Sequence, residues 1–243
     1  MDKVVVITGA SSGLGLSLSK RFVQDDCFVF GVSKTKKNWK ALNKTFAYSS
    51  RLTMLQVDVT SEREVKQFVT NVYKKMGRID ILINSAGYSN HPIKIDKLSL
   101  KEFQKNLSAN LISVFLMCKH SIPIFRKQNQ GLIINISSMA GKRAVPRLAA
   151  YSASKFGVLA LSQSIAKENE SFHLKCVSVC PGGMNTVMRT KLFGLEDAQK
   201  QQSSEFVADV IMKVVKNEIA VDSGGDIVVR HGKITAINPV PPP

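Results

Sequence analysis

The stretch VVVITGASSGLG, residues 4–15, decides the fold. It begins with a run of apolar, mostly β-branched residues, which is typical of a buried parallel strand. It continues into a turn with glycines at positions 9, 13 and 15, and then into a helical pattern. Glycines at a strand-to-helix turn let the backbone approach a diphosphate, which the free N–H groups of the helix N-terminus can bind. Such a motif can also be a simple turn, so its place directly after the first strand is the stronger argument.

The rest of the chain repeats this alternation of strands and helices. Strands are expected at 4–8, 28–33, 52–57, 79–84, 132–137 and 175–180, with a possible last strand at 226–230. Helices are expected at about 14–25, 36–48, 61–76, 99–128, 150–170 and 204–216. The alternation predicts βαβ units, and hence a parallel sheet with helices on both faces. We expect one domain over residues 1–238, followed by an exposed proline-rich tail at 239–243.

The composition is that of an ordinary globular protein. Hydrophobic residues make up 44% and charged residues 21% of the chain, and the N-terminus enters a strand at once, without the segments of a signal peptide. A cytoplasmic protein that does not enter a membrane is therefore expected. Four cysteines lie in apolar segments without a CxxC pair, so neither a zinc site nor a redox motif is expected: Cys27, Cys118, Cys176 and Cys180.

The chain is strongly basic. It has 34 Lys and Arg against 18 Asp and Glu, which gives a net charge of +16 and raises the question of an anionic partner. The cations are scattered and do not alternate with aromatic residues, so nucleic-acid binding is not expected. Between Asp26 and Asp58, however, there is no acidic residue. The cations in that interval are Lys34, Lys36, Lys37, Lys40, Lys44 and Arg51.

The segment YSASK, residues 151–155, places a phenol and an amine four positions apart. In a helix these positions lie on one face, a single turn apart. An ammonium near a tyrosine favours the phenolate, so we expect Lys155 to lower the pKa of Tyr151 towards neutral pH, where it could act as an acid or a base. Taken alone, the segment also fits a surface tyrosine beside a surface lysine.

Six ordered motifs together resemble those of the short-chain dehydrogenase/reductase family. They are TGASSGLG (8–15), NSAG (84–87), Asn110, ISS (136–138), YSASK (151–155) and Pro181-Gly182. The resemblance covers residues 3 to about 190; Ser85 replaces a frequent Asn, and the stretch after about 190 lacks a usual closing pattern. It implies a doubly wound α/β fold, the Rossmann fold, with seven strands in the order 3-2-1-4-5-6-7. The nucleotide would lie across the carboxyl ends of the strands.

The resemblance also implies which residues bind the nucleotide. The diphosphate would be held by Gly9, Ser11, Gly13, Leu14 and Gly15, and the adenosine side by Asp58, Asn84, Ala86 and Gly87. Further cofactor contacts are expected at Ser12, Val59, Tyr151, Lys155, Pro181 and Gly182. Asp58 could instead cap the helix that starts near Ser61.

The end of the second strand indicates which nucleotide is bound. It reads GVSKT (31–35), with Ser33 where an NAD enzyme commonly carries an acid. Because a 2'-phosphate needs a cation and is repelled by an acid, we expect NADP(H), bound through Ser33 and Lys34. A solvated helix face would account equally well for several of the cations from Lys36 to Lys44.

By the same resemblance, the catalytic residues are Asn110, Ser138, Tyr151 and Lys155. In reduction, hydride passes from NADPH to a carbonyl carbon, Ser138 donates a hydrogen bond to the oxygen, and Tyr151 gives the proton. Asn110 would hold a water that links Lys155 to solvent, although it could instead bend or bridge its helix. Strand alternation and the family spacing select Ser138 over Ser137.

The substrate is not fixed by these motifs. Its wall is expected from residues 139–147, 88–95 and a lid region at about 183–203. The wall cations Lys142, Arg143 and Arg147 suggest an anionic group, although loop cations are often only solvated. The apolar lid residues, which could instead pack on the lid's own core, are Met184, Val187, Met188, Leu192 and Phe193.

Two other functions remain open at this stage. One is a 3-oxoacyl-(acyl-carrier-protein) reductase-like enzyme, because an acidic carrier protein would suit a basic partner. The other is a non-catalytic protein that senses nucleotide or binds an anionic surface. Whatever the function, the apolar content of helices 99–128 and 150–170 predicts a homodimer or homotetramer.

Overall fold

The computed structural model describes residues 2–36, 39 and 50–240. The strands are β1 (Val4–Thr8), β2 (Phe28–Ser33), β3 (Leu52–Gln56), β4 (Ile81–Asn84), β5 (Gly131–Ile136), β6 (Leu174–Pro181), β7 (Asp226–Arg230) and β8 (Lys233–Asn238). The helices are α1 (Gly13–Gln24), α3 (Glu62–Met76), α4 (Leu100–Leu107), α5 (Ser113–Gln128), α6 (Ala149–Glu168), α7 (Val187–Phe193), α8 (Leu195–Gln199) and α9 (Ser204–Val215). Short helical turns are η1 (Ile95–Lys97), η2 (Ser108–Ile112) and η3 (Met139–Gly141). The helix expected at 36–48 falls almost wholly outside the described residues, as do Lys37, Lys40 and Lys44.

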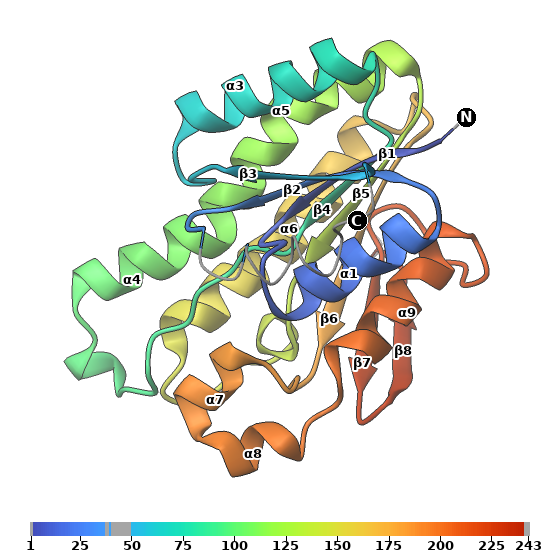
Figure 1. The fold of residues 1–243 in the computed structure, drawn as a ribbon. Coiled ribbons are helices and arrows are strands. Elements are labelled where there is room, and N and C mark those ends of the chain that lie inside the picture. Colours follow the sequence, from blue (N-terminus) through green and yellow to red (C-terminus); the bar gives the residue numbers. More distant parts are fainter. Residues whose placement is uncertain (1, 37–38, 40–49, 241–243) are drawn as a thin grey trace.

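One sheet organises the molecule, with the strand order β3-β2-β1-β4-β5-β6-β7-β8 (Figure 1). The order of the first seven strands is the expected one, and all of their pairings are parallel. The structure adds an eighth strand that the sequence did not predict, because β8 pairs antiparallel with β7 at the edge of the sheet. Its residues alternate between half-buried and exposed, so β8 lacks the continuous apolar run by which the buried strands were recognised.

Helices cover both faces of this sheet (Figure 1). One core cluster joins the sheet to α1 and α9, and the other joins it to α3, α5 and α6. Successive β1 side chains supply the two clusters in turn, Val5 and Ile7 to the first and Val4 and Val6 to the second. The carboxyl ends of the parallel strands therefore meet along one edge, where loops can build a site.

The long helix predicted at 99–128 is interrupted in the structure. Between α4 and α5, η2 forms a π-helical turn, and Asn110 lies within it, fully buried. The Asn110 side chain accepts from the Tyr88 amide at 2.7 Å and donates to the Tyr88 carbonyl at 2.8 Å and to Ser154 Oγ at 3.0 Å. The turn thus ties the helix to the loop after β4 and to α6, and π-turns are frequent at functional sites.

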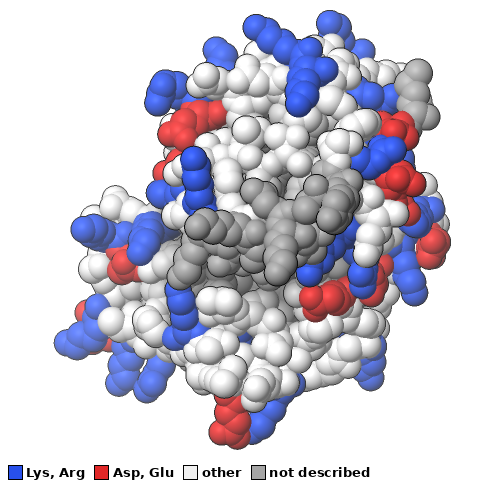
Figure 2. Space-filling view, in the orientation of Figure 1, with Lys and Arg blue, Asp and Glu red and all other residues white. Residues whose placement is uncertain are grey.

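The basic residues are dispersed over the surface. Figure 2 shows Lys and Arg spread around the visible face, with Asp and Glu interspersed among them. Lys and Arg side chains do gather in one place, around a cavity of the candidate site, where Arg143, Arg189, Lys200 and Arg230 line the wall.

Candidate active site

Three neighbouring cavities form a trough along the carboxyl ends of the strands. We name them after a residue of each: the Lys34 cavity of about 360 Å³, the Lys155 cavity of about 190 Å³ and the Arg230 cavity of about 340 Å³. The first two share lining residues of the glycine turn and of the loop after β4. The last two share Ser138 and Tyr151. The trough therefore has room for an extended ligand beside a second, smaller one.

The glycine turn between β1 and α1 forms the floor where the first two cavities meet. Gly9 has a φ of +69°, and a Cβ there would stand 2.9 Å from the Ala86 Cα. A Cβ on Gly15 would stand 2.4 Å from the Gly9 carbonyl oxygen, so both positions exclude a side chain. Gly15 is buried beneath the turn and lines none of the three cavities. The other predicted turn residues line the trough: Gly9, Ser11, Ser12, Gly13 and Leu14.

Most of the other predicted cofactor residues also line the trough. Those in the Lys34 cavity are Ser33, Lys34, Asp58, Val59, Ala86 and Gly87. Those in the Lys155 cavity are Tyr151, Lys155, Pro181 and Gly182. Asn84 does not reach it, because its side chain is buried in the sheet and donates to Asn135 Oδ1 at 2.8 Å.

One positioning residue was missed by the sequence reasoning. Thr8 Oγ1 accepts from the backbone amides of Ser85 and Ala86, each at 3.0 Å. This pair of bonds holds the loop after β4 against the glycine turn. A hydroxyl at the end of the first strand, directly before the first glycine, is the only sequence signal for it.

The far end of the Lys34 cavity carries one ion pair. Lys34 Nζ lies 2.6 Å from Asp58 Oδ2, and the lysine side chain is 71% exposed. Burial raises the pKa of Asp58, but hydrogen bonds from Lys34 and Thr60 outweigh it, so the pKa is lowered overall. Asp58 is not the helix cap that it could have been, because Ser61 caps α3.

At the end of β2, the Ser33 hydroxyl donates to the Thr35 carbonyl at 2.9 Å and accepts from Trp39 Nε1 at 3.0 Å. Ser33 is the last residue of β2, and Lys34 follows it directly. An oxyanion bound here would meet a cation and would face no carboxylate on β2.

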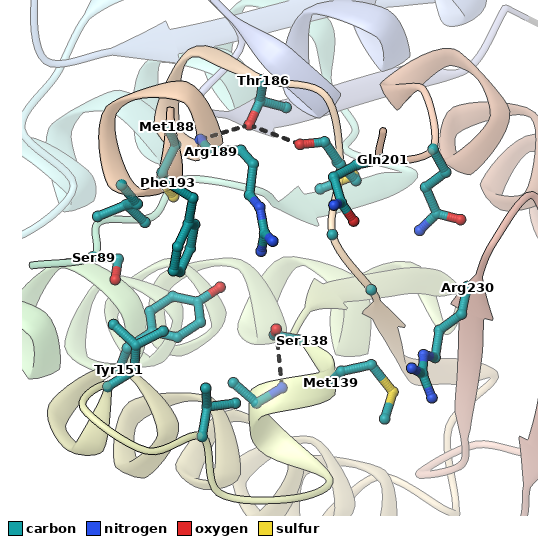
Figure 3. Close-up of a pocket in the computed structure, with 18 of the residues that line it drawn as sticks. Ser89, Ser138, Met139, Tyr151, Thr186, Met188, Arg189, Phe193, Gln201 and Arg230 are labelled. Carbon is teal, nitrogen blue, oxygen red and sulfur yellow. Dashed lines mark hydrogen bonds between the residues drawn. The ribbon is translucent and has the colours of Figure 1, made fainter. Parts of the chain in front are cut away.

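The two candidate catalytic hydroxyls meet where the Lys155 and Arg230 cavities join. Ser138 follows β5 and accepts from the Ala140 amide at 3.1 Å as the cap of η3. Tyr151 lies in the first turn of α6. Figure 3 shows both hydroxyls pointing into the cavity, with Arg189 of α7 facing them. Ser137 also lines the Lys155 cavity, but it is buried and its hydroxyl donates to the Lys155 carbonyl at 2.9 Å, and of the two serines only Ser138 lines both cavities.

Lys155 lies behind Tyr151. Its Nζ donates to the Ile136 carbonyl at 2.8 Å and lies 5.7 Å from the centre of the Tyr151 ring. Burial lowers the pKa of Lys155 to about 8. Burial also raises the pKa of Tyr151, against which a hydrogen bond from Ser138 acts. In the chain alone, burial therefore outweighs any lowering of the Tyr151 pKa by Lys155, because both groups are desolvated and the amine is bonded to a carbonyl. The lowering by the ammonium and a positive nicotinamide together, in the oxidised complex, stays a prediction.

Asn110 stands behind the trough. A Cβ on Gly87 would be 3.2 Å from Asn110 Oδ1 and 3.9 Å from Lys155 Nζ, so both polar groups lie next to this glycine, although only Lys155 lines one of the three cavities. The bonds of Asn110 to Tyr88 and Ser154 match the alternative in which it bridges its helix. Its role in holding a water next to Lys155 stays a prediction.

The Arg230 cavity is lined by the expected wall and lid segments and also by an unexpected one. Of the three wall cations, only Arg143 lines it; Lys142 instead pairs with Asp226 at 2.5 Å. The apolar lid residues Met184, Met188, Leu192 and Phe193 line it as well, whereas Val187 lines the Lys155 cavity. The cationic or ionisable lining residues that the sequence reasoning missed are Arg189, Lys200, Arg230 and His231.

Metal ligation finds no support in this geometry. Among residues 2–36, 39 and 50–240, no group of three or more His, Cys, Asp or Glu side chains could hold a metal ion. The four cysteines are buried and have free thiols.

Comparison with known proteins gives the same picture. The chain matches the family model described as short chain dehydrogenase over residues 3–196. It is 31% identical over 227 residues to an NADPH-dependent pterin aldehyde reductase of Arabidopsis thaliana, with 93% of each chain covered. It is 30% identical over 243 residues to the 3-oxoacyl-[acyl-carrier-protein] reductase FabG of Thermotoga maritima, covering 96% and 98% of the two chains. The structure of ElxO with NADP bound superposes with a TM-score of 0.85 at 25% identity, over 94% of this chain and 96% of that one.

Proposed function

Since the chain belongs to the short-chain dehydrogenase family, we propose that it is an NADP(H)-dependent oxidoreductase acting on a carbonyl group or a secondary alcohol. The observation that carries this proposal is the trough itself. Ser138 and Tyr151 stand where the Lys155 cavity, which the glycine turn also lines, joins the Arg230 cavity. A dinucleotide on the turn and a substrate in the Arg230 cavity would thus meet at these two hydroxyls.

The residues present fit NADP(H). The turn has no space for a Cβ at Gly9 or Gly15, and the residues from Ser11 to Leu14 line the trough, where their backbone can approach a diphosphate. The strand end that would select NAD with an acid carries Ser33, and Lys34 lines the same cavity. The relative from Arabidopsis thaliana is named as NADPH-dependent, and ElxO was solved with NADP. When bound, the nucleotide supplies or accepts the hydride.

The remaining chemistry belongs to the chain. In reduction, the hydroxyls of Ser138 and Tyr151 donate hydrogen bonds to the carbonyl oxygen, which stabilises the negative charge that develops there. The raised pKa of Tyr151 means that the phenol is protonated at neutral pH, so it has a proton to give as the negative charge develops on the oxygen. Lys155, with a pKa of about 8, can hold or release a proton close to neutral pH directly behind the phenol.

The test of this function is the Tyr151→Phe substitution. It removes one oxygen and keeps the ring, so NADPH affinity measured by calorimetry should stay within about twofold, while turnover should fall by roughly 10²-fold or more, the usual size of general acid catalysis. A variant that retains more than a tenth of wild-type kcat would refute the role of the phenol. Failure of the wild type to bind NADPH would refute the proposal as a whole.

We further propose that the substrate carries negative charge. Among the described residues that line the Arg230 cavity there is no Asp or Glu, whereas Arg143, Arg189, Lys200 and Arg230 all line it. A panel of phosphorylated sugars, oxoacyl thioesters and cyclic ketones, assayed by NADPH oxidation, separates the candidates. Preference for an oxoacyl thioester on an acyl-carrier protein would favour the FabG-like alternative, to which the Thermotoga maritima relative points.

A homodimer or homotetramer is also proposed, built on the face of η2, α5 and α6. Ile112, Phe115 and Phe156 are 43%, 46% and 44% exposed, and together they place large apolar side chains on neighbouring helical segments. The segment Leu100–Gln128 is long and apolar enough to cross a membrane by composition alone, yet it packs against α3 and α6. Covering its exposed face with a second copy accounts for both observations. Light scattering that gives a monomer would contradict this proposal.

A further inference from the structure

We infer that Arg230, together with Arg143, binds a carboxylate or phosphate group of a small carbonyl substrate, which makes the turn between β7 and β8 a specificity element. This inference rests on the proposed function and deepens it, because it assigns the negative charge to one part of the cavity. The Arg230 cavity, at about 340 Å³, is of a size that suits a small molecule. It extends from the hydroxyls of Ser138 and Tyr151 to the end of β7.

The four Lys and Arg side chains in this cavity differ in their partners. Arg189 forms a two-bond ion pair with Asp197, at 2.5 and 3.0 Å, and Lys200 pairs with Glu196 at 2.6 Å. Within the described part of the chain, neither Arg143 nor Arg230 has an Asp or Glu within 4.0 Å. The positive charge that is not already neutralised in the cavity is therefore that of these two arginines.

Arg230 is held in place by its surroundings. It is the last residue of β7 and pairs with Lys233 across a turn formed by His231 and Gly232, whose φ angles are +52° and +68°. Such a two-residue turn with positive φ at both positions is tight and fits the twist of the strands. The arginine therefore leaves a strand end, a rigid base for a binding side chain.

Two further residues, Gly182 and Gln202, hold the same turn in place. The Gly182 amide donates to the Val229 carbonyl at 2.8 Å, and a Cβ on Gly182 would stand 3.1 Å from Arg230 Cγ. The Gln202 side chain donates to the Val229 carbonyl at 2.9 Å and accepts from the Gly232 amide at 3.2 Å. The stem of Arg230 thus lies against the residue that follows β6, and Figure 3 shows it on the side of the cavity that also holds Met139.

Arg143 lines the same cavity from a different segment, the loop that follows η3. Its backbone amide, two residues after the end of η3, donates to the Met139 carbonyl at 3.0 Å. Because η3 is capped by Ser138, Arg143 is anchored to the same short turn as the candidate catalytic serine. An arginine presents a planar fork of donors that matches a carboxylate or phosphate, and hydrogen bonds between charged groups are about twice as strong as neutral ones.

The test compares a charged carbonyl compound with its neutral analogue. The probes are 4-carboxybenzaldehyde, its methyl ester, and 4-formylphenyl phosphate, each assayed by NADPH oxidation. In the wild type, kcat/KM for at least one anionic probe should exceed that for the ester by about tenfold or more, since one charge-assisted bond is worth this factor. The better of the two anions shows whether the site prefers carboxylate or phosphate.

Substitution then locates the preference. In Arg230→Gln the ratio of kcat/KM for the anion to that for the ester should fall by roughly tenfold, mainly through KM, and Arg230→Lys should keep part of it. Lys233→Gln is the matched control, because it removes one positive charge from the same hairpin at a residue that does not line the cavity. A ratio that falls equally in the Lys233→Gln protein would show a general effect of surface charge and would overturn the assignment.

A binding measurement keeps the inference testable without turnover. Calorimetry with 4-(hydroxymethyl)benzoate and its methyl ester, with and without NADP, gives the same ratio from affinities. Equal affinity of the wild type for acid and ester overturns the inference and leaves the oxidoreductase role untouched. Preferred binding of the acid, with no NADPH oxidation by any carbonyl probe, supports the anion site and counts against the proposed function alone.

Discussion

Lys34 is the residue on which the preference for NADP(H) over NAD(H) should depend. Its Nζ is 2.6 Å from Asp58 Oδ2, and the side chain is 71% exposed. An exposed ion pair of this kind contributes about 0–1 kcal/mol to stability, so Lys34→Ala should leave the free energy of unfolding within about 1 kcal/mol of the wild type. The same lysine is the cation at the end of β2 that lines the cavity, where a 2'-phosphate would need one.

The expected effect on binding can be worked from these contacts. A hydrogen bond from Lys34 to a bound phosphate contributes about 1.5–3 kcal/mol. Forming it weakens the existing ion pair between Lys34 and Asp58, which is worth about 0–1 kcal/mol and is subtracted. The net loss lies between about 0.5 and 3 kcal/mol, and its midpoint of about 1.75 kcal/mol predicts a fall in NADPH affinity of roughly 20-fold, with NADH affinity changed by less than about twofold. Unpaired Asp58 would also repel the phosphate, which acts in the same direction.

The assay can use the protein's own fluorescence. Trp39 is the one tryptophan of the chain, and its Nε1 donates to Ser33 Oγ at 3.0 Å, so its emission should respond to nucleotide bound at this edge. Lys36→Ala is the matched control, because Lys36 lies over the Trp39 ring at 5.8 Å and does not line the cavity. Equal losses for NADPH and NADH in Lys34→Ala, or the same NADPH loss in Lys36→Ala, would refute the reasoning.

Three further substitutions test the trough, the buried amine and the proposed interface. Gly9→Ala places a Cβ 2.9 Å from Ala86 Cα at positive φ, so the turn must shift and nucleotide affinity, measured by calorimetry, should fall by at least about tenfold. An unchanged affinity would show that the turn accepts a side chain at Gly9 without harm to binding. Lys155 has a folded pKa of about 8 against 10.5 unfolded, so the unfolded chain binds more protons between these values and stability must rise with pH there. In urea titrations the wild type should therefore gain on the order of 3 kcal/mol over Lys155→Met from pH 7 to 10.5, and a constant difference would contradict the shift. Phe115→Asp should give a smaller particle by light scattering, whereas Leu195→Asp, equally apolar and 60% exposed on α8, should not; an unchanged size would refute the interface.

The elements that the sequence predicted well are those whose signal is local. The parallel strands are continuous apolar runs between two helical layers, and their order follows from the family resemblance. The π-turn at Asn110 was not predictable from periodicity, because it depends on hydrogen bonds to Tyr88 and to Ser154, which comes 44 residues later. The raised pKa of Tyr151 was missed for a similar reason, since its first cause is burial and the sequence shows only that an amine stands four residues away.

Side-chain direction was the other quantity that spacing could not supply. Asn84 follows the pattern of a cofactor residue but turns into the sheet towards Asn135. Lys142 and Arg143 are adjacent, yet the first is drawn to Asp226 on β7 and the second lines the cavity. Which neighbour takes which direction depends on the partners that the fold brings near, and Asp226 is 84 residues away in sequence.

The family model covers only part of the chain, and the position of its limit bears on substrate selection. The family match ends at residue 196, and it contains Ser138, Tyr151, Lys155 and the glycine turn. Lys200, Arg230 and His231 lie beyond that limit and yet line the cavity next to the two hydroxyls. A family motif specifies the chemistry that its members share, so residues that select one substrate are expected outside it. The inference that Arg230 selects an anion follows this logic, because it places specificity on a hairpin that the family pattern does not describe.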